Sequence, residues 1–542
     1  MLSQELSRKP TNVSMSNWRI RHWVTAVIVG AAAAALLTAD NNPKPADWPM
    51  FGQNISNSGG NSTETSISAS NVGQLKTKWT FTTGGDISAR AAVVKDMAYF
   101  PDWGGNLWAL NATNGKLIWS HQLSDYGLAA NTHSRTSPAV VGGVVYVGTQ
   151  EGAYLLAINA STGALIWKTR LETVDPFAMI TASPTFYNGV VYTGVASNEE
   201  GLAGFVPGFQ CCSARGSAVA VNAATGAILW KTYMTPEGYS GAGVWGSNPV
   251  VDTASSTVFV STGNNYSHPT NAAYLTCISN GGTAASCSSP DNHVDSIVAL
   301  DLATGTVKWA TKLVNWGQQV FGVADGSDDW NVSCFVPPFA NCPSNAGPDY
   351  DFSSAPNLIT YQTATGAKTI LGAGQKSGIY FALDPTTGAM LWQAQIGPGS
   401  SLGGMEWGSA TDGKRIYVSI TNFYGIPTAF GSAGSWAALD PATGAILWQR
   451  ADPNGAIDLG PLSVANGVLY APSMAGSATA PTMLAMDAAT GKTLWSFAAG
   501  SSVNAGATIV NGMVYWGSGY AHLGIPGYTT NNKFYAFSKN GN

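Results

Sequence analysis

The sequence predicts an all-β protein, an eight-bladed β-propeller built from four-stranded antiparallel blades. Three observations indicate this fold: a repeat that ends in Trp, complementary half-repeats at the two ends of the chain, and the composition. Of 542 residues, 63 are Gly and 19 are Trp, while only 10% are charged, against about 25% in ordinary soluble domains. Such a composition is typical of tightly turned β-structure and excludes a disordered chain, a coiled coil or a helical bundle.

The repeat reads Ala-x-Asp or Ala-x-Asn, then a turn centred on Gly, then Trp ten residues after the Ala. Each copy predicts a β-hairpin, because Asp and Asn accept turn hydrogen bonds and Gly adopts positive φ. A second pair of apolar strands precedes each copy, so each unit is expected to have four strands. Seven complete copies lie at 109–119, 157–167, 220–230, 299–309, 382–392, 438–448 and 485–495.

The ends of the chain carry half a copy each. Trp79 has no Ala-x-Asp strand before it, and Phe534 to Ser538 form such a strand without a Trp. Joined, they make an eighth unit that closes a ring and leaves no long free edge. The alternative, a linear solenoid, would need capping repeats.

Extra residues are concentrated in one part of the ring. The spacing between successive repeat Trp residues rises from 40 to 83 and is largest between Trp167 and Trp392, whereas a bare blade needs about 40–45 residues. Insertions of this kind usually build a site on one face of a propeller.

The N-terminus predicts export. Basic Arg19 and Arg21 precede a short apolar run and small residues, so residues 1–39 are expected to be a signal peptide, with Met15 as an alternative start. An uncleaved anchor is the alternative. Residues 40–74 are then a lead-in segment and 75–542 the propeller. No other long apolar segment follows, so a periplasmic or secreted protein without membrane attachment is expected after cleavage.

Six cysteines agree with an oxidising compartment. Their spacing indicates local bridges, Cys277–Cys287 and Cys334–Cys342, and adjacent Cys211 and Cys212 could form a vicinal disulfide or remain two unrelated thiols. No Cys-x-x-Cys-His and no zinc-type spacing occurs, so neither attached haem nor zinc is expected. The net charge of −5 offers no basic surface for nucleic acid.

Polar clusters lie within the long insertions. Carboxylate and amide oxygens suit Ca²⁺, and a nearby Trp and Lys would suit a flat anionic cofactor. The alternative is that these residues only cap loops and turns. The clusters fall at 180–184 with 194–200, 243–248 with 261–265, 327–331 and 374–380.

The Trp repeat resembles that of the pyrroloquinoline quinone (PQQ) alcohol dehydrogenases over about residues 45–542. The sequence is most similar to the polyvinyl-alcohol dehydrogenases at Asn198-Glu199-Glu200-Gly201, Gln210-Cys211-Cys212 and Asp328-Asp329-Trp330-Asn331. The resemblance implies an eight-bladed periplasmic propeller with a central Ca²⁺ and quinone, and a lanthanide in place of Ca²⁺ is an alternative.

The resemblance also implies a metal site. Glu199 matches the family's metal-binding Glu, with Glu200 as the alternative if the register shifts by one. Asn264 lies in a Thr-Gly-Asn turn that matches a second ligand, and Asn331 is expected as a third.

The implied quinone site has several parts. Trp245 is expected to stack on the quinone, while Thr181, Lys376 and Arg135 are expected to bind its polar groups. A Cys211–Cys212 disulfide is expected to contact the quinone too, although the pair lies on a different blade from that in methanol dehydrogenases.

The family's proton acceptor is the second Asp of Asp-x-Trp-Asp, a position that Asn331 holds here. An Asn cannot take up a proton near neutral pH, so Asp329, or else Asp328, is expected to act as the base. The other reading is altered or absent chemistry, in a protein that binds the quinone without turnover.

The function implied by the resemblance is oxidation of an alcohol by PQQ and Ca²⁺, with the cation as Lewis acid. The expected substrate is a secondary alcohol, including a polymeric one such as polyvinyl alcohol, and the expected electron acceptor is a separate cytochrome c. The alternative function is a non-catalytic propeller that acts as an outer-membrane assembly scaffold.

Overall fold

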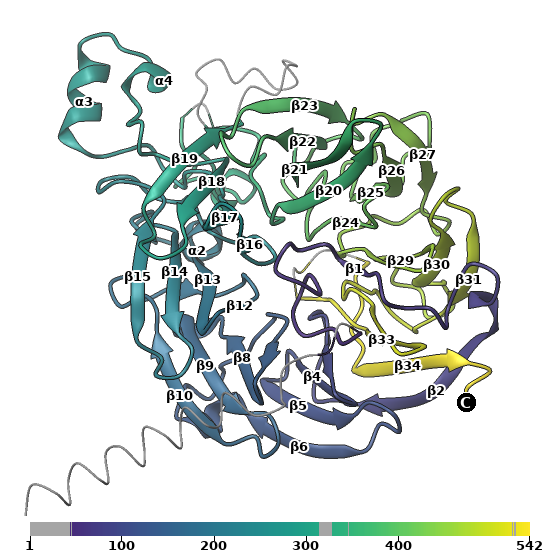
Figure 1. Ribbon diagram of the computed structural model, residues 1–542. Coiled ribbons are helices and arrows are strands. Elements are labelled where there is room, and N and C mark those ends of the chain that lie inside the picture. The colour runs from purple at the N-terminus through teal and green to yellow at the C-terminus, as the bar shows by residue number, and fades with distance from the viewer. Residues whose placement is uncertain (1–43, 45, 314–327, 345, 523, 525–526) are drawn as a thin grey trace, which may run out of the picture.

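The computed structural model describes residues 44, 46–313, 328–344, 346–522, 524 and 527–542. They form a ring of eight sheets around a central axis (Figure 1), which confirms the predicted eight-bladed propeller. The predicted signal peptide, residues 1–39, lies outside the described residues. No helix of the described residues has the length and apolar character needed to span a membrane.

The blades are numbered in chain order, and each contains four antiparallel strands with the last at the outer edge of the ring (Figure 1). Blades 1 to 4 consist of β3 (Ala92–Val94), β4 (Met97–Pro101), β5 (Asn106–Asn111) and β6 (Leu117–Gln122); β7 (Ala139–Val141), β8 (Val144–Gly148), β9 (Tyr154–Asn159) and β10 (Leu165–Arg170); β12 (Thr185–Tyr187), β13 (Val190–Ser197), β14 (Ser217–Asn222) and β15 (Ile228–Tyr233), with β11 (Ala178–Met179) paired to β13; and β16 (Val250–Asp252), β17 (Thr257–Ser261), β18 (Ser296–Asp301) and β19 (Val307–Lys312).

Blades 5 to 8 follow the same order, and the eighth uses strands from both ends of the chain. They consist of β20 (Asn357–Thr363), β21 (Gly366–Gly374), β22 (Ile379–Leu383) and β23 (Met390–Gln395); β24 (Ala410–Thr411), β25 (Ile416–Ile420), β26 (Ser435–Leu439) and β27 (Ile446–Ala451); β28 (Ser463–Ala465), β29 (Val468–Pro472), β30 (Met483–Asp487) and β31 (Thr493–Phe497), with β1 (Gly60–Asn61) paired to β28; and β32 (Thr508–Val510), β33 (Met513–Gly517), β34 (Lys533–Lys539) and β2 (Leu75–Thr82).

Ring closure occurs where the half-repeats predicted it. Strand β2 pairs antiparallel with β34, and Trp79 lies opposite Ala536. The predicted hairpin turns are also present: in blade 1 the Asn111 side chain accepts hydrogen bonds from the main-chain N–H groups of Thr113 and Asn114, each at 3.1 Å.

Each repeat Trp reaches across to the next blade. Seven of the indole N–H groups donate to a main-chain carbonyl there, from Trp79 onto Ala112 at 3.0 Å round to Trp495 onto Leu75 at 3.0 Å. The repeat Gly lies beneath the ring: a Cβ on Gly115 would come within 2.7 Å of the Trp79 indole, and its φ of +71° also favours Gly. The repeat therefore encodes contacts between blades as well as turns.

Apolar clusters fill the interfaces between neighbouring blades. Between blades 1 and 2, for example, buried Tyr99 and Leu107 pack with Val145 and Leu156. Burial on both sides explains the continuous apolar character of the inner strands.

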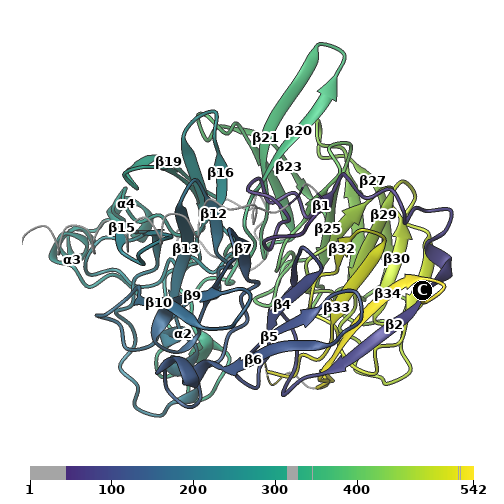
Figure 2. The ribbon, with the colours of Figure 1, turned by 60° about the horizontal axis from the view of Figure 1, so that its bottom comes forward.

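The antiparallel order gives the ring two distinct faces. Turns between first and second strands and between third and fourth strands lie on one face, here called the turn face. Connections between second and third strands, and links from one blade to the next, lie on the other, the loop face. In Figure 2 the β20–β21 hairpin of the turn face projects at the top and α2 (Glu199–Phe205) of the loop face lies near the bottom.

Most helices belong to the loop-face connections. An excursion between β17 and β18 carries α3 (Ala272–Ser279) and α4 (Ala284–Cys287), which are joined by the Cys277–Cys287 disulfide and stand out from the ring (Figure 1). The short 3₁₀ helices are η1 (Val72–Gln74), η2 (Leu123–Tyr126), η3 (Glu151–Ala153) and η4 (Val332–Cys334).

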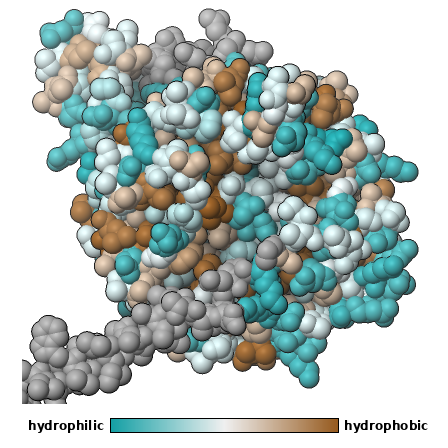
Figure 3. Space-filling model, in the orientation of Figure 1, coloured by the Kyte–Doolittle hydropathy of each residue, from teal (hydrophilic) through white to brown (hydrophobic). Residues whose placement is uncertain are grey.

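The lead-in segment crosses the turn face over the centre of the ring (Figure 1). Its carbonyls accept hydrogen bonds from the inner strands of six blades in ring order, and the Asn61 side chain donates to Ile509 of blade 8 at 2.8 Å. The surface of this face is a mosaic of hydrophilic and apolar residues (Figure 3). The acceptor carbonyls and their donors are Trp48 with Val93, Pro49 with Val140, Ile55 with Val251, Ser56 with Leu358, Ser58 with Thr411, and Gly59 with Val464.

Candidate active site

A cavity of about 350 Å³ lies on the ring axis at the loop face. Loop-face connections from most of the blades supply its walls, as the insertions in the sequence predicted for one face. It is lined by Trp103, Arg135, Gln150, Met179, Ser197, Asn198, Glu200, Gly201, Trp245, Trp330, Val332, Asp349, Asp351, Ser353, Lys376, Ser401, Leu402, Glu406, Trp407 and His522.

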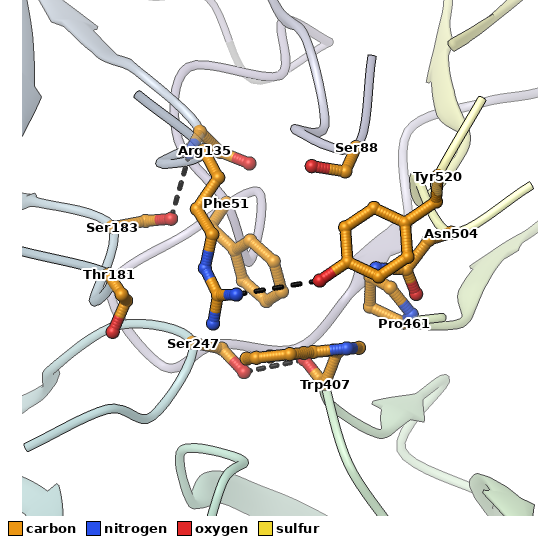
Figure 4. Close-up of a pocket in the computed structure, with 11 residues that line it drawn as sticks. Phe51, Ser88, Arg135, Thr181, Ser183, Ser247, Trp407, Pro461, Asn504 and Tyr520 are labelled. Carbon is orange, nitrogen blue, oxygen red and sulfur yellow. Dashed lines mark hydrogen bonds between the residues drawn. The ribbon is translucent and has the colours of Figure 1, made fainter. Parts of the chain in front are cut away.

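A second pocket, of about 40 Å³, shares Arg135 and Trp407 with the first. The Arg135 guanidinium lies 4.4 Å from the centre of the Trp407 ring and donates to the Tyr520 hydroxyl at 3.5 Å. Figure 4 shows Phe51 of the lead-in among the residues that line this pocket. The lead-in therefore contributes to the wall of the pocket nearest the turn face.

Lys376 lies between two carboxylates in the main cavity. Its Nζ is 2.8 Å from Asp351 Oδ1 and 3.2 Å from Asp349 Oδ2, and all three side chains are buried. Burial alone would lower the pKa of Lys376, but Asp349 and Asp351 outweigh it and raise that pKa well above its usual range. One cation with two buried anions leaves an excess negative charge.

That excess favours a proton on one carboxyl group. Burial, opposed by Lys376 and reinforced by Asp351, raises the pKa of Asp349 well above its usual range. Only the ionised form of Asp349 can accept a proton, and Lys376, whose Nζ lies 3.2 Å from Asp349 Oδ2, favours that form.

Two glutamates add to the acidic lining. Burial raises the pKa of Glu200 to about 8 and that of Glu406 to about 7. Glu406 Oε2 is buried without a hydrogen-bond partner. Both groups thus offer acceptor oxygens to a cation or a donor in the cavity.

Neighbouring Glu199 and Glu200 have different environments. Glu199 accepts hydrogen bonds from the main-chain N–H groups of Ser213 and Ala214, each at 2.7 Å, and from the Ser213 hydroxyl at 3.2 Å. It holds the connection that follows α2, whereas Glu200 lines the cavity. The structure therefore places Glu200, the alternative metal ligand, at the cavity wall, and not Glu199, which the resemblance favoured.

Trp245, which the family resemblance assigns to quinone stacking, lines the cavity. Gly263 lies beside it: a Cβ there would come within 2.8 Å of both Trp245 Nε1 and Asp351 Oδ2. Thr181 donates to the Trp245 carbonyl at 3.2 Å and lines the smaller pocket. Of the predicted cofactor residues, Trp245, Lys376 and Arg135 thus share one cavity, with Thr181 adjacent.

Asn264 and Asn331 differ in the state of their side-chain oxygens. Asn264 donates to the Trp330 and Asn265 carbonyls, each at 2.9 Å, and its Oδ1 is buried without a partner. Asn331 caps η4: its Oδ1 accepts from Ser333 N–H at 2.9 Å, and its amide donates to two carbonyls. Asn264 retains an acceptor for a ligand, whereas Asn331 is occupied by its own loop.

The predicted bases lie outside the cavity wall. Asp328 accepts from the main-chain N–H groups of Asp349 at 3.0 Å and Tyr350 at 2.8 Å, so it holds the segment that carries the cavity carboxylates. Asp329 pairs with Nδ1 of His268. Neither Asp328 nor Asp329 is among the residues that line the cavity.

All six cysteines form the disulfides that their spacing indicated, including the vicinal Cys211–Cys212 bridge. Cys211 lies 3.7 Å from the Asn331 side-chain amide. The pair is half-buried beside the η4 loop and is not among the cavity-lining residues.

Two oxygen acceptors suit Ca²⁺ or a lanthanide. The Glu200 carboxylate lines the cavity, whereas Asn264 Oδ1 is not among the lining atoms and is buried without a hydrogen-bond partner among the described residues. Within the described ranges, no group of three or more His, Cys, Asp or Glu side chains is arranged to hold a metal by itself. Such a cation normally takes six to eight oxygen ligands. The residues therefore fit a cation that also binds amide, water or cofactor oxygens.

Sequence reasoning missed Asp349, Asp351, Glu406 and Trp407. A usable signal was present, since Asp349 and Asp351 are spaced to share one face of an extended segment just before β20. The pair could have been matched with Lys376, which lies in the connection between β21 and β22. Glu406-Trp407 lies in the link between blades 5 and 6 and carries no repeat signature.

A family model described as outer membrane protein assembly factor BamB matches residues 61–207 and 432–542. A polyvinylalcohol dehydrogenase from Sphingopyxis sp. (strain 113P3) is 30% identical over 506 residues, covering 84% of this chain and 70% of that protein. A polyvinylalcohol dehydrogenase from Pseudomonas sp. is 29% identical over 523 residues, covering 88% and 74%. Quinohemoprotein alcohol dehydrogenase ADHIIG from Pseudomonas putida HK5 shares the fold, with a TM-score of 0.69 and 19% identity over 95% of this chain and 82% of that chain.

Proposed function

We propose that this chain, which belongs to the quinoprotein alcohol dehydrogenase family, oxidises a neutral secondary alcohol with PQQ and a Ca²⁺ or lanthanide ion held in the loop-face cavity. The observation that carries this proposal is the buried group of Lys376, Asp349 and Asp351, which shares the cavity with Trp245. A buried cation between two carboxylates is costly to maintain in a protein that needs it only for stability.

The residues that would hold the cofactor and the cation follow from the cavity. Trp245 offers a stacking face. Lys376 and Arg135 offer hydrogen-bond donors to carbonyl and carboxylate oxygens, and Thr181 lines the adjoining smaller pocket. Glu200 and Asn264 Oδ1 would bind the cation. When bound, PQQ supplies a two-electron acceptor and the cation a Lewis acid.

The chain itself would manage the proton. Oxidation of an alcohol to a carbonyl compound removes a hydride from carbon and a proton from oxygen. Asp349 would take the proton at its carboxylate, and Lys376 would hold that carboxylate in place and help to determine its charge. This assignment replaces Asp329, because Asp329 is paired with His268 outside the cavity wall.

The named relatives support a polymeric substrate, since both oxidise polyvinyl alcohol by their names. The chain has no Cys-x-x-Cys-His for covalent haem, which favours a separate cytochrome c as electron acceptor. The signal-like N-terminus favours a periplasmic or secreted location.

The second candidate is a non-catalytic scaffold. The observation that favours it is the match of the BamB model to residues 61–207 and 432–542. Those ranges contain Arg135 and Glu200 of the cavity wall but exclude Trp245, Asp349, Asp351 and Lys376. The match therefore does not cover the buried group that carries the first proposal.

Reconstitution tests the proposal. Purified protein incubated with PQQ and Ca²⁺ should retain the quinone after gel filtration, and a secondary alcohol should then convert its absorption spectrum to that of the reduced form. Lys376→Met should lose quinone retention, whereas the exposed control Lys414→Met should keep it. Failure of the parent protein to retain or reduce PQQ, with either Ca²⁺ or a lanthanide, would favour the scaffold.

A further inference from the structure

The six most exposed Phe and Tyr side chains of the described residues all belong to loop-face connections. Elsewhere, exposed large apolar side chains are aliphatic, mostly pairs on the outer strands such as Met390-Leu391. These six residues are here called the aromatic rim: Phe177, Phe205, Phe335, Phe339, Tyr424 and Phe430, with exposed fractions of 39%, 69%, 51%, 52%, 48% and 40%.

Part of the rim is built on α2 and the η4 loop. Phe205 ends α2, whose Gly204 packs so closely on η4 that a Cβ would come within 2.8 Å of Val332, a cavity residue. Phe335 packs edge-on against Trp330 of the cavity wall, with 5.2 Å between ring centres. Disulfide Cys334–Cys342 closes the loop that carries Phe335 and Phe339.

Phe177 of the rim lies in the link between blades 2 and 3, and the two remaining residues come from the connection between β25 and β26 in blade 6. The Tyr424 hydroxyl is 3.2 Å from that of Ser401, which lines the cavity. Phe430 lies in the same connection. The rim thus reaches the cavity wall from two separate insertions.

The segments that carry most of the rim contain no charged residue. Residues 201–214, 331–347 and 420–434 lack Asp, Glu, Lys and Arg altogether. The carboxylates and the lysine of the site lie within the cavity instead. A surface of exposed rings without charge fits an uncharged partner with carbon–hydrogen surface, because it neither attracts nor repels ions and gains from apolar contact.

We propose that the aromatic rim binds the carbon chain of an uncharged polymeric alcohol on either side of the hydroxyl that enters the cavity. This inference rests on the proposed function. The cavity of about 350 Å³ must also hold the quinone and the cation, so it leaves room for little more than the reacting hydroxyl, and the remainder of the chain must lie across its mouth. Exposed aromatic patches otherwise carry a solubility cost, and such patches commonly mark binding sites.

The test compares a polymer with a small alcohol. Phe205→Ser, Phe339→Ser and Phe430→Ser would be assayed with polyvinyl alcohol and with 2,4-pentanediol, using an artificial dye as electron acceptor. We expect the triple variant to raise KM for the polymer at least fivefold, with kcat and KM for the diol within twofold of the parent. The matched control is Leu391→Ser. Leu391 is 52% exposed on an outer strand, and its substitution should leave kcat and KM for both substrates unchanged.

A binding measurement separates this inference from the proposed function. In native gels that contain polyvinyl alcohol, the parent should be retarded and the triple variant should not, whether or not the protein is active. Equal retardation of both proteins, or an unchanged polymer KM, overturns the inference even if the diol is oxidised. Loss of rate only with cytochrome c as acceptor overturns it too and identifies the rim as a protein-docking surface. Oxidation of neither alcohol would refute the proposed function, and the gel result would still decide whether the rim binds polymer.

Discussion

Blades 7, 8, 1 and 2 contrast with blades 3 to 6. In the first group successive repeat Trp residues are 40 to 48 positions apart, and connections are short; in the second the spacing reaches 83. The BamB family model matches the first group and the adjoining parts of blades 3 and 6. The second group contributes Glu200, Trp245, Asp349, Asp351, Lys376 and Glu406 to the cavity.

The difference separates two kinds of information in one chain. The repeat, present in all eight blades, carries the contacts that close and stabilise the ring, namely the indole hydrogen bonds and the Gly residues beneath them. Insertions of blades 3 to 6 carry most of the charged residues of the cavity and the rim. Substitutions in the repeat and in the insertions should therefore have different effects, and the following experiments test that division.

The largest effect is expected from loss of ring closure. Deletion from Lys533 onward removes β34, the partner of both β2 and β33, and exposes two inner edges of blade 8. We expect no cooperative thermal transition, measured by circular dichroism. Deletion of residues 540–542 alone is the control and should leave a cooperative transition; cooperative melting of the longer truncation would disprove closure through this strand.

Next in size is the loss of a cavity carboxylate in the insertion group. Asp349→Asn should lower turnover of the reconstituted enzyme about a hundredfold or more, a usual loss for a general base, while its melting temperature stays near that of the parent. Asp328→Asn is the comparison: it should mainly lower the melting temperature, because Asp328 holds the main chain at Asp349 and Tyr350. If Asp329→Asn lost its turnover and Asp349→Asn kept full activity, the catalytic base would lie in the 328–331 segment, as the sequence predicted.

A repeat Trp should affect stability without touching the cavity. Trp448 is 7% exposed and donates to the Ala488 carbonyl of blade 7 at 3.1 Å. Trp448→Ala should cost about 3–5 kcal/mol of unfolding free energy, measured by denaturant titration. Its neighbour Leu447 is 49% exposed on the same strand, so Leu447→Ala should stay within about 0.5 kcal/mol. Similar losses of unfolding free energy in the two variants would mean that the Trp contact between blades adds little stability.

The smallest effect concerns a buried acid in the link between blades 6 and 7. Burial, reinforced by Asp452, raises the pKa of Asp458 well above its usual range. The folded protein thus binds this proton more tightly than the unfolded chain, and stability falls as pH rises from the unfolded pKa through the folded one. Asp458→Asn removes that loss, so its melting temperature should exceed the parent's at pH 8 by on the order of 1 °C or more, with a smaller difference at pH 5. Exposed Asp291→Asn is the control; an equal gain at both pH values would contradict the assignment.

The ring was predictable from sequence because its determinants are local and repeated. Asn111, Gly115 and Trp119 fall at fixed spacing in a single hairpin, and the same spacing occurs in all seven complete copies. Trp245 and Lys376 were predicted from short motifs that resemble the family's, and both line the cavity; that they bind a quinone stays a prediction. The half-repeats at Trp79 and Phe534 identified the closing pair because each supplied what the other lacked.

The cavity's acids were harder to predict because long insertions have no period. Asp328 and Asp349 are 21 residues apart, and only the fold shows that the first supports the main chain of the second. Glu199 and Glu200 differ by a single position, and the choice between them depends on the orientation of α2. The sequence order of acids does not reveal which of them face the axis.

The lead-in segment covers the turn-face end of the ring axis (Figure 1). Hydrogen bonds to successive blades hold it across the turn face, and Phe51 reaches the inner pocket from that side. A cavity covered on that side is entered from the loop face. A group bound at its inner end must therefore bind before the groups nearer the mouth and leave after them, and each product must leave through the opening by which the next substrate enters.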